Sequence, residues 1–285
     1  MAEQGTAFSV RSNGVTLSGD DAGEGPAVVL LHGLTATRRY VVMGSRLLEH
    51  SGHRVLAYDA RGHGRSTAAL DPTAYGYEHL AADLQAVLDV LGLERVILAG
   101  ASMGAHTATR FALGNPERVH ALCLITPSYD PALPRTADSF AGWDALAQGL
   151  REGGVEGFVR AYDLAAVPAP WRETIEKVVR QRLAAHRHTR AVADALEVVP
   201  RSRPFASMAE LGGIAAPTVV VASRDEADPG HPLALGERYA AAIPGARLVV
   251  EREGSPIAWQ GGRLSRVLLE LAEPERRWRQ GRDMR

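Results

Sequence analysis

Two patterns of apolar and polar positions alternate over the first half of the chain. Short, continuously apolar runs rich in valine, leucine and isoleucine are typical of strands buried on both faces. They are "AVVLLHG" (27–33), "HRVLAYD" (53–59), "ERVILAG" (94–100) and "ALCLIT" (121–126). Between them, leucines recur at helical spacing, as at Leu80, Leu84 and Leu88. This alternation of strands and helices predicts a parallel sheet with helices on both faces.

The segments on either side of this region modify the prediction. Upstream, "AFSV" and "GVTLSGD" are joined by Asn13 and Gly14, a pair typical of a hairpin turn, so we expect antiparallel strands at one edge of the sheet. From Pro127 to Pro204 the strand signal stops and apolar residues recur at helical spacing. Two later runs, "APTVVVAS" (216–223) and "ARLVVER" (246–252), return to the strand pattern.

These patterns predict the α/β class, with a mostly parallel eight-stranded sheet flanked by helices. The sheet and its helices form a core of residues 1–126 and 207–272, and residues 127–206 form a helical insertion after the sixth strand, expected to act as a lid. The arginine-rich tail, 273–285, lacks periodicity and is expected to dock loosely. A chain of 285 residues, 46% of them hydrophobic, is long enough to bury such a core.

Composition excludes several classes of partner. The 32 basic and 33 acidic residues are scattered, so neither nucleic acid nor an anionic membrane is expected to bind. No apolar run reaches the roughly 18 residues needed to cross a bilayer, and the N-terminal sequence lacks the features of a secretory signal. The single cysteine, Cys123, lies in an apolar run and is interpreted as a buried, inert thiol. We therefore expect a cytoplasmic protein.

The most informative motif is "LAGASMGAH", in which a strand leads into a helix through a turn at Ser102. Small residues, Gly100 and Gly104, lie two positions to either side, as a strained turn requires when larger side chains would collide with the backbone. Ser102 would project above the sheet, and the following helix would direct its N-terminal amides and its positive dipole end toward the group under attack. Ser102 is therefore the candidate nucleophile.

A second motif, "LLHGLTAT", follows an earlier strand. His32 and Gly33 would let the chain turn sharply and present a backbone amide, that of Leu34 or a neighbour, opposite the amide of Met103. Two convergent amides form an oxyanion hole, which stabilises negative charge on a carbonyl oxygen under attack. His32 itself is interpreted as a hydrogen-bonded structural residue.

Together these motifs resemble the α/β-hydrolase fold family, in the branch that carries a lid after the sixth strand. The resemblance covers nearly the whole chain and includes "VVLLHG", "AYDARGHGRS" (57–66), "GASMGA", "APTVVVASRD" and "IPGARLVV". "SMGAHTA" is similar to the turn that carries the nucleophile in carbon–carbon bond hydrolases and small carboxylesterases, whereas dehalogenases and epoxide hydrolases place an aspartate there. The resemblance implies that Asp59 and His63 shape a loop near the site.

The resemblance further implies an acid after the strand "TVVVAS" and a histidine after the last strand. Asp225, Glu226 and Asp228 lie in the loop and compete for the role of the acid. In "VVEREGSPIAW" the position of the histidine is held by Ser255, whose hydroxyl cannot act as a general base near neutral pH. An atypical or degenerate catalytic triad is therefore predicted.

Other histidines are candidates for the missing base. His231, in "DEADPGHP", shares the acidic loop and could swing toward Ser102. His106, one turn into the helix after Ser102, would line the pocket wall and bind substrate. His186 and His188, in the helical insertion, are interpreted as part of a solvated helix face.

The leading hypothesis is a hydrolase that acts through Ser102 on an ester, acyl or carbon–carbon bond of a small organic substrate in an apolar pocket. The alternative is a small-ligand binding protein, or a lyase or cyclase, that keeps the pocket and lacks the base. Neither a metal nor a cofactor is expected, because no metal-ligand spacing and no glycine-rich phosphate loop occur. The expected partner is a small-molecule substrate, and assembly as a homodimer is left open.

Overall fold

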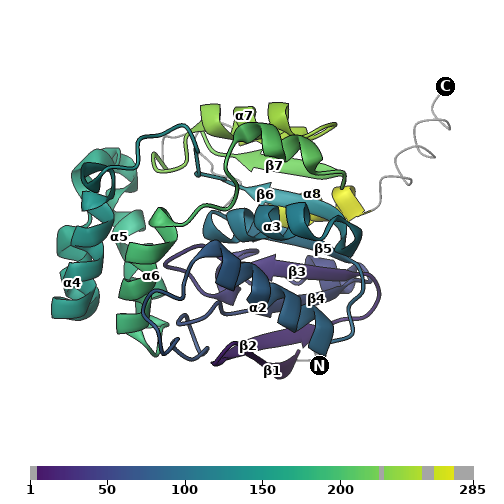
Figure 1. The fold of residues 1–285 in the computed structure, drawn as a ribbon, viewed down its shortest axis with the longest axis horizontal. Coiled ribbons are helices and arrows are strands. Elements are labelled where there is room, and N and C mark those ends of the chain that lie inside the picture. The colour runs from purple at the N-terminus through teal and green to yellow at the C-terminus, as the bar shows by residue number, and fades with distance from the viewer. Residues whose placement is uncertain (1–4, 225–227, 252–259, 273–285) are drawn as a thin grey trace.

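The computed structural model describes residues 5–224, 228–251 and 260–272. Within them, eight strands form one sheet in the order β1-β2-β4-β3-β5-β6-β7-β8 (Figure 1). They are β1 (Thr6–Ser12), β2 (Val15–Ala22), β3 (Ala27–Leu31), β4 (Arg54–Tyr58), β5 (Val96–Ala101), β6 (Val119–Ile125), β7 (Thr218–Ala222) and β8 (Arg247–Val250). Strand β2 is antiparallel to both its neighbours, and the other pairs are parallel. The predicted mostly parallel sheet with a hairpin at one edge is confirmed.

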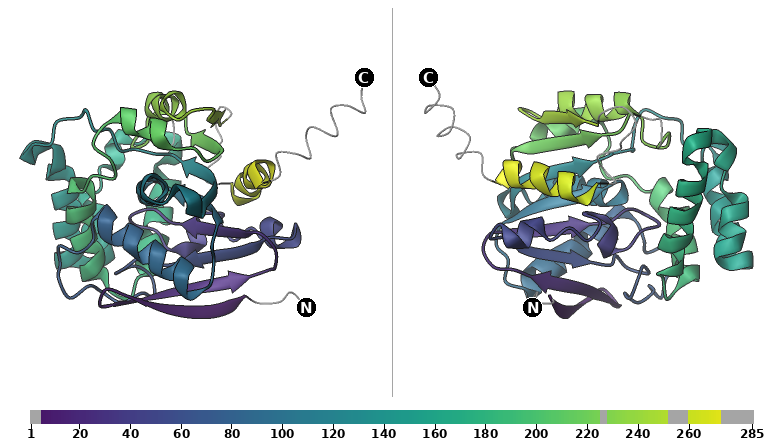
Figure 2. Two further views of the ribbon diagram at one scale, coloured as in Figure 1. Left: turned by 45° about the vertical axis from the view of Figure 1, so that its right-hand side comes forward. Right: turned by 180° about the vertical axis from the view of Figure 1, so that it is seen from behind.

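Helices cover both faces of the sheet. The α-helices are α1 (Leu47–His50), α2 (Tyr77–Val90), α3 (Met103–Gly114), α4 (Ala137–Ala161), α5 (Arg172–Ala184), α6 (Thr189–Arg201), α7 (Leu233–Ala242) and α8 (Gly261–Ala272). The 3₁₀ helices are η1 (Arg38–Tyr40), η2 (Pro116–Arg118), η3 (Leu164–Ala166), η4 (Ala169–Trp171) and η5 (Met208–Gly213). Helices α2, α3 and α7 pack on one face, and α1 and α8 pack on the other (Figure 2).

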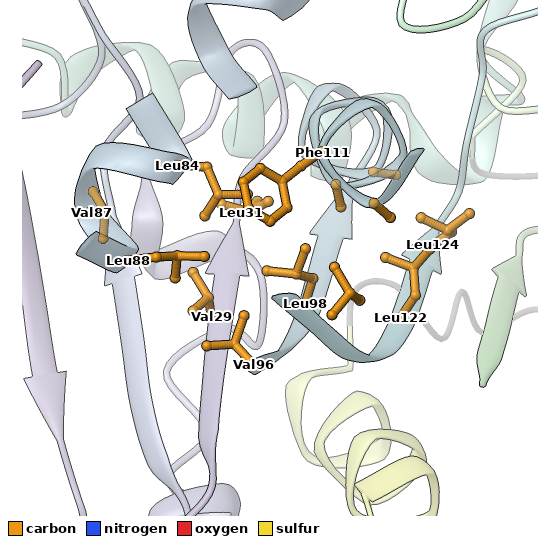
Figure 3. Close-up of a cluster of buried hydrophobic side chains, with 14 of the residues drawn as sticks. Val29, Leu31, Leu84, Val87, Leu88, Val96, Leu98, Phe111, Leu122 and Leu124 are labelled. Carbon is orange, nitrogen blue, oxygen red and sulfur yellow. The ribbon is translucent and has the colours of Figure 1, made fainter. Parts of the chain in front are cut away.

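The central strands are apolar at every position because helices cover both faces of the sheet. All five residues of β3 are buried, and because side chains alternate along a strand, Val29 and Leu31 face one layer of helices. There they pack in one cluster with Leu84 of α2 and Phe111 of α3 (Figure 3). Val28 and Leu30 face the other way and belong to a second apolar cluster, which includes residues of α1 and α8.

The helical insertion supplies α4, α5 and α6, which lie together beside one end of the sheet (Figure 1). Buried side chains of α4 and α6 form one apolar cluster with Leu34 and Met103 of the core. The insertion thus covers the end of the sheet at which β3 and β5 finish. The predicted division into domains at residues 127 and 206 stays a prediction, and the tail 273–285 lies outside the described residues.

Candidate active site

Ser102 occupies a strained turn between β5 and α3. Its φ of 50° and ψ of −111° are unusual for a residue with a side chain. A Cβ atom on Gly104 would lie 2.1 Å from the carbonyl oxygen of Leu31, and one on Gly100 would lie 2.2 Å from that of Gly104. Glycine is therefore required at both positions, because the backbone of this turn packs directly against neighbouring backbone.

His231 lies beside Ser102. Its Nε2 is 2.9 Å from Oγ of Ser102, and its Nδ1 is 2.7 Å from Oδ1 of Asp228. Asp228 and His231 belong to one turn between β7 and α7, in which the His231 amide donates a hydrogen bond to the Asp228 carbonyl at 3.1 Å. A continuous chain of contacts therefore runs from carboxylate through imidazole to hydroxyl.

Asp228 is held as an anion. Burial raises the pKa of its carboxyl, but His231 and Arg182 outweigh burial and keep that pKa below its ordinary value. Arg182 comes from α5, and its guanidinium lies over the ring of Tyr40, with the central carbon 5.3 Å from the ring centroid. An ionised Asp228 can only accept a hydrogen bond, so it favours the His231 tautomer with the proton on Nδ1. Nε2 of that tautomer faces Ser102 as an acceptor.

The structure brings together some of the residues that the sequence singled out. His231, considered as a substitute base, contacts Ser102, and Asp228, one of three candidate acids, contacts His231. Asp225 and Glu226 lie outside the described residues, and so does Ser255. The two residues that continue the chain of contacts from Ser102, His231 and Asp228, thus come from a single loop.

The amides of Leu34 and Met103 are available beside Ser102. Both residues line the same pocket as Ser102, and a Cβ atom on Gly33 would lie 3.6 Å from the Cβ of Ser102. Neither amide donates a backbone hydrogen bond to another residue of the described chain. Met103 is the first residue of α3, where the helix itself provides no acceptor. Their role as an oxyanion hole stays a prediction.

His106 lines the pocket, but protein groups contact both of its ring nitrogens. Its Nδ1 is 2.9 Å from the hydroxyl of Tyr77, and its Nε2 accepts hydrogen bonds from the amides of Ser128 and Tyr129 at 2.9 and 3.0 Å. The ring therefore anchors the segment that follows β6. Substrate binding by His106 stays a prediction.

His32 and His63 fix the loop that carries Leu34. The Nδ1 of His32 is 2.8 Å from the Gly33 carbonyl, and its Nε2 accepts the Ala60 amide at 2.9 Å. The Nε2 of His63 is 2.6 Å from the Leu34 carbonyl. Both rings are buried, and they orient the peptides that surround the Leu34 amide.

The interpretation of His186 as a residue on a solvated helix face was wrong, whereas His188 is exposed. His186 lies between α5 and α6 and is buried against the core. Its Nδ1 accepts the amide of Gly64 at 2.8 Å, and its Nε2 is 3.1 Å from the carbonyl of Thr35. The helical insertion is therefore joined by hydrogen bonds to the loops after β3 and β4.

The buried histidines predict an acid-sensitive fold. Burial is the main cause that lowers the pKa of His32 and His106 to about 3, and that of His186 to about 4, from 6.5. Because the unfolded chain binds these protons more readily, their contribution to stability is complete above pH 6.5 and declines as the pH falls toward 3 to 4. Each histidine should lower the free energy of unfolding by about 1.4 kcal/mol per pH unit within that range.

Calorimetric Tm values between pH 7.5 and 5, a range in which most carboxylates stay ionised, will test this prediction. We expect Tm to fall steadily below pH 6.5 and unfolding at pH 5.5 to take up protons, detected as a dependence of the unfolding enthalpy on the buffer. A constant Tm across this range would contradict it.

A pocket of about 200 Å³ opens beside Ser102. Its walls are largely apolar and come from the core, from the segment after β6 and from α4 and α6. The apolar and aromatic lining residues are Leu34, Tyr77, Met103, Tyr129, Leu133, Pro134, Phe140, Trp143, Val199 and Pro200. The volume is below the roughly 300–1,000 Å³ that is usual for sites of drug-sized ligands, and it suits a small molecule.

Within the three described ranges, no group of histidine, cysteine and acidic side chains is arranged as a metal site. The helices of the same ranges are all too short or too polar to cross a bilayer.

Comparison with known proteins adds the family. A family model described as alpha/beta hydrolase fold matches residues 26–258. The chain belongs to the α/β-hydrolase fold family. The resemblance inferred from the motifs is thereby confirmed.

Relatives of this α/β-hydrolase fold protein cover most of its length. A putative carbamate hydrolase, RutD, of Variovorax paradoxus (strain S110) is 34% identical over 205 residues, 72% of this chain and 75% of the relative. The 2-hydroxy-6-oxononadienedioate/2-hydroxy-6-oxononatrienedioate hydrolase 2 of Pseudomonas putida is 33% identical over 242 residues, 81% and 82% of the two chains. The enol-lactonase of Burkholderia xenovorans LB400 has a TM-score of 0.77 at 24% identity, over 93% of this chain and 99% of that chain, and so shares the fold.

Proposed function

We propose that this α/β-hydrolase fold protein is a serine hydrolase that cleaves an ester or related acyl bond of a small substrate. The observation that carries the proposal is the 2.9 Å contact between Oγ of Ser102 and Nε2 of His231, continued at 2.7 Å to Asp228. Nucleophile, general base and orienting acid recur in this relation on unrelated folds, because the reaction requires their geometry and not their order in the chain.

Acylation begins when a substrate carbonyl lies between Ser102 and the backbone amides of Leu34 and Met103. Oγ of Ser102 bonds to the carbonyl carbon while its proton passes to Nε2 of His231, and Asp228 stabilises the resulting imidazolium. The amides of Leu34 and Met103 donate hydrogen bonds to the oxyanion. When the intermediate collapses, the bond to the leaving group breaks, and His231 gives its proton to the leaving atom.

Deacylation repeats these steps with water. His231 takes a proton from a water molecule whose oxygen bonds to the acyl carbon. The bond between that carbon and Oγ of Ser102 then breaks, and His231 returns the proton to the serine. The products are a carboxylic acid and the free enzyme.

The alternative of a binding protein without a base depends on Ser255 in the position where the family resemblance implies a histidine. The contact between His231 and Ser102 offers a base from a different loop, and this favours hydrolysis over binding alone. The names of the relatives, a carbamate hydrolase and an oxononadienedioate hydrolase, favour the same reaction class. The small apolar pocket favours a short acyl group.

A fluorophosphonate probe tests the proposal, because an activated serine displaces its fluoride and forms a stable bond to phosphorus. We expect intact-protein mass spectrometry to find a single phosphonyl group per chain, mapped to Ser102, and none in Ser102→Ala. Ser128→Ala is the matched control, since Ser128 lines the same pocket without contacting His231. An unlabelled wild-type protein, or full labelling of Ser102→Ala, would contradict the proposal.

A further inference from the structure

Among the residues that the structure describes, two charged residues, Asp130 and Arg135, line the pocket beside Ser102, and the charge of Asp130 is compensated. The carboxylate of Asp130 pairs with the guanidinium of Arg238, 3.1 Å from Oδ1 to Nη2, and it accepts the amide of Ala132 at 3.0 Å. This pairing holds the pKa of Asp130 below its ordinary value against the effect of burial. The negative charge in the lining is therefore already satisfied by the protein.

Arg135 has no such counter-ion among the described residues. No carboxylate in the described part of the chain forms an ion pair with it, and its Nη2 donates to the carbonyl oxygens of Pro200, at 3.3 Å, and Arg201. These contacts, made to the end of α6, fix the guanidinium without neutralising it. An arginine has five donors, so the fork keeps hydrogen-bonding capacity for a further acceptor.

A neighbouring arginine provides a contrast. Both Arg135 and Arg201 lie over the ring of Phe140, with their guanidinium carbons 5.3 and 4.6 Å from the ring centroid. Arg201 forms an ion pair with Asp144 at 2.8 Å and does not line the pocket. Of this pair, therefore, only Arg135 brings an uncompensated charge to the pocket.

The charge of Arg135 acts within the pocket. Burial raises the pKa of the hydroxyls of Tyr77 and Tyr129, and the positive charge of Arg135 opposes that rise in both. Both tyrosines line the pocket together with Ser102. An anionic group bound there would experience the same attraction.

We infer that the pocket binds an acyl substrate that carries a carboxylate, held by Arg135 while the carbonyl under attack lies at Ser102. A guanidinium matches a carboxylate through two parallel hydrogen bonds, and the apolar walls between the two ends suit a short hydrocarbon chain. The identity of the reacting bond rests on the proposed function, whereas binding of the carboxylate does not.

Two methyl esters that differ only at the far end, monomethyl glutarate and methyl pentanoate, test the inference. We expect kcat/KM to be about 10- to 100-fold higher for the anionic ester, the range expected for a hydrogen-bonded charge pair. Arg135→Gln should remove this preference through KM with little change in kcat, because the carboxylate is bound equally in the ground and transition states. Arg135→Lys should keep part of the preference for the anionic ester, and Arg201→Gln should leave that preference intact.

Calorimetric titration of Ser102→Ala with both esters separates this inference from the proposed function. Tighter binding of monomethyl glutarate, lost in the double variant with Arg135→Gln, supports the carboxylate site even if no protein hydrolyses either ester. Hydrolysis that depends on Ser102 but shows the same KM for both esters, unchanged in Arg135→Gln, would overturn the carboxylate site and leave the proposed function standing. If Ser102→Ala binds the two esters with equal affinity, and the double variant does so too, the carboxylate site is overturned as well.

Discussion

Replacing His231 with alanine is expected to lower kcat/KM for ester hydrolysis by about 10⁴- to 10⁶-fold, the range found when the base of a serine triad is removed. Without the imidazole, the hydroxyl of Ser102 keeps its proton and is a weak nucleophile. The side chain of His231 is 23% exposed, so its removal leaves no large cavity. We therefore expect Tm to change little, and steady-state kinetics will measure the loss directly.

His188→Ala is the matched control, because this histidine of the helical insertion is exposed and should leave kcat/KM unchanged. A His231→Ala protein that keeps a tenth or more of wild-type kcat/KM would show that another group activates Ser102. Residues 252–259 contain no histidine, so that group would not be a histidine of this segment.

Asp228→Asn is expected to lower kcat by about 10³- to 10⁴-fold while KM changes little. A neutral amide cannot stabilise the imidazolium that forms as Ser102 is deprotonated. If the amide also turns its N–H₂ toward Nδ1 of His231, it favours the tautomer whose proton points at Ser102, and the base is blocked. The effect falls on kcat because Asp228 contacts the imidazole and does not line the pocket.

Asp225→Asn and Glu226→Gln test the competing acids in the same assay. Both should keep kcat within a few-fold of wild type, since the contact to Nδ1 is made by Asp228. A loss in either variant as large as that in Asp228→Asn would transfer the role of the acid to that residue.

The fold and the strained turn at Ser102 were predictable from sequence because their determinants are local. Continuous apolar runs specify strands that are covered on both faces, and alternating helical stripes specify the cover. The turn at Ser102 needs only a strand, a helix and small neighbours such as Gly104, all of which are adjacent in the chain. Such patterns can be recognised in the sequence without any knowledge of tertiary contacts.

The proposed base, His231, was not predictable to the same degree, because its position depends on tertiary contacts. The path of the loop after β7 brings His231 from 129 positions away to Ser102, and spacing in the chain does not encode that distance. The burial of His186 was missed for the same reason, since its partners Gly64 and Thr35 lie on other loops. Arg135 shows a third limit, because whether a carboxylate lies beside it among the described residues depends on the tertiary structure.

The boundaries of the last helix illustrate a further limit of pattern analysis. Helix α8 begins at Gly261. A Cβ atom on Gly261 would lie 1.8 Å from the carbonyl oxygen of Val42, so the helix begins where backbone packs against backbone. Apolar periodicity does not reveal such a close approach.

The shared turn of Asp228 and His231 has a mechanical consequence. Because Asp228 and His231 lie three residues apart and are joined by a backbone hydrogen bond, we expect a displacement of the turn to preserve their mutual contact. The distance between Nε2 of His231 and Oγ of Ser102 would then be the contact that varies, and it joins the turn of Asp228 and His231 to the β5–α3 turn. A ligand that displaced the turn of Asp228 and His231 would therefore change the rate of the reaction through this one distance.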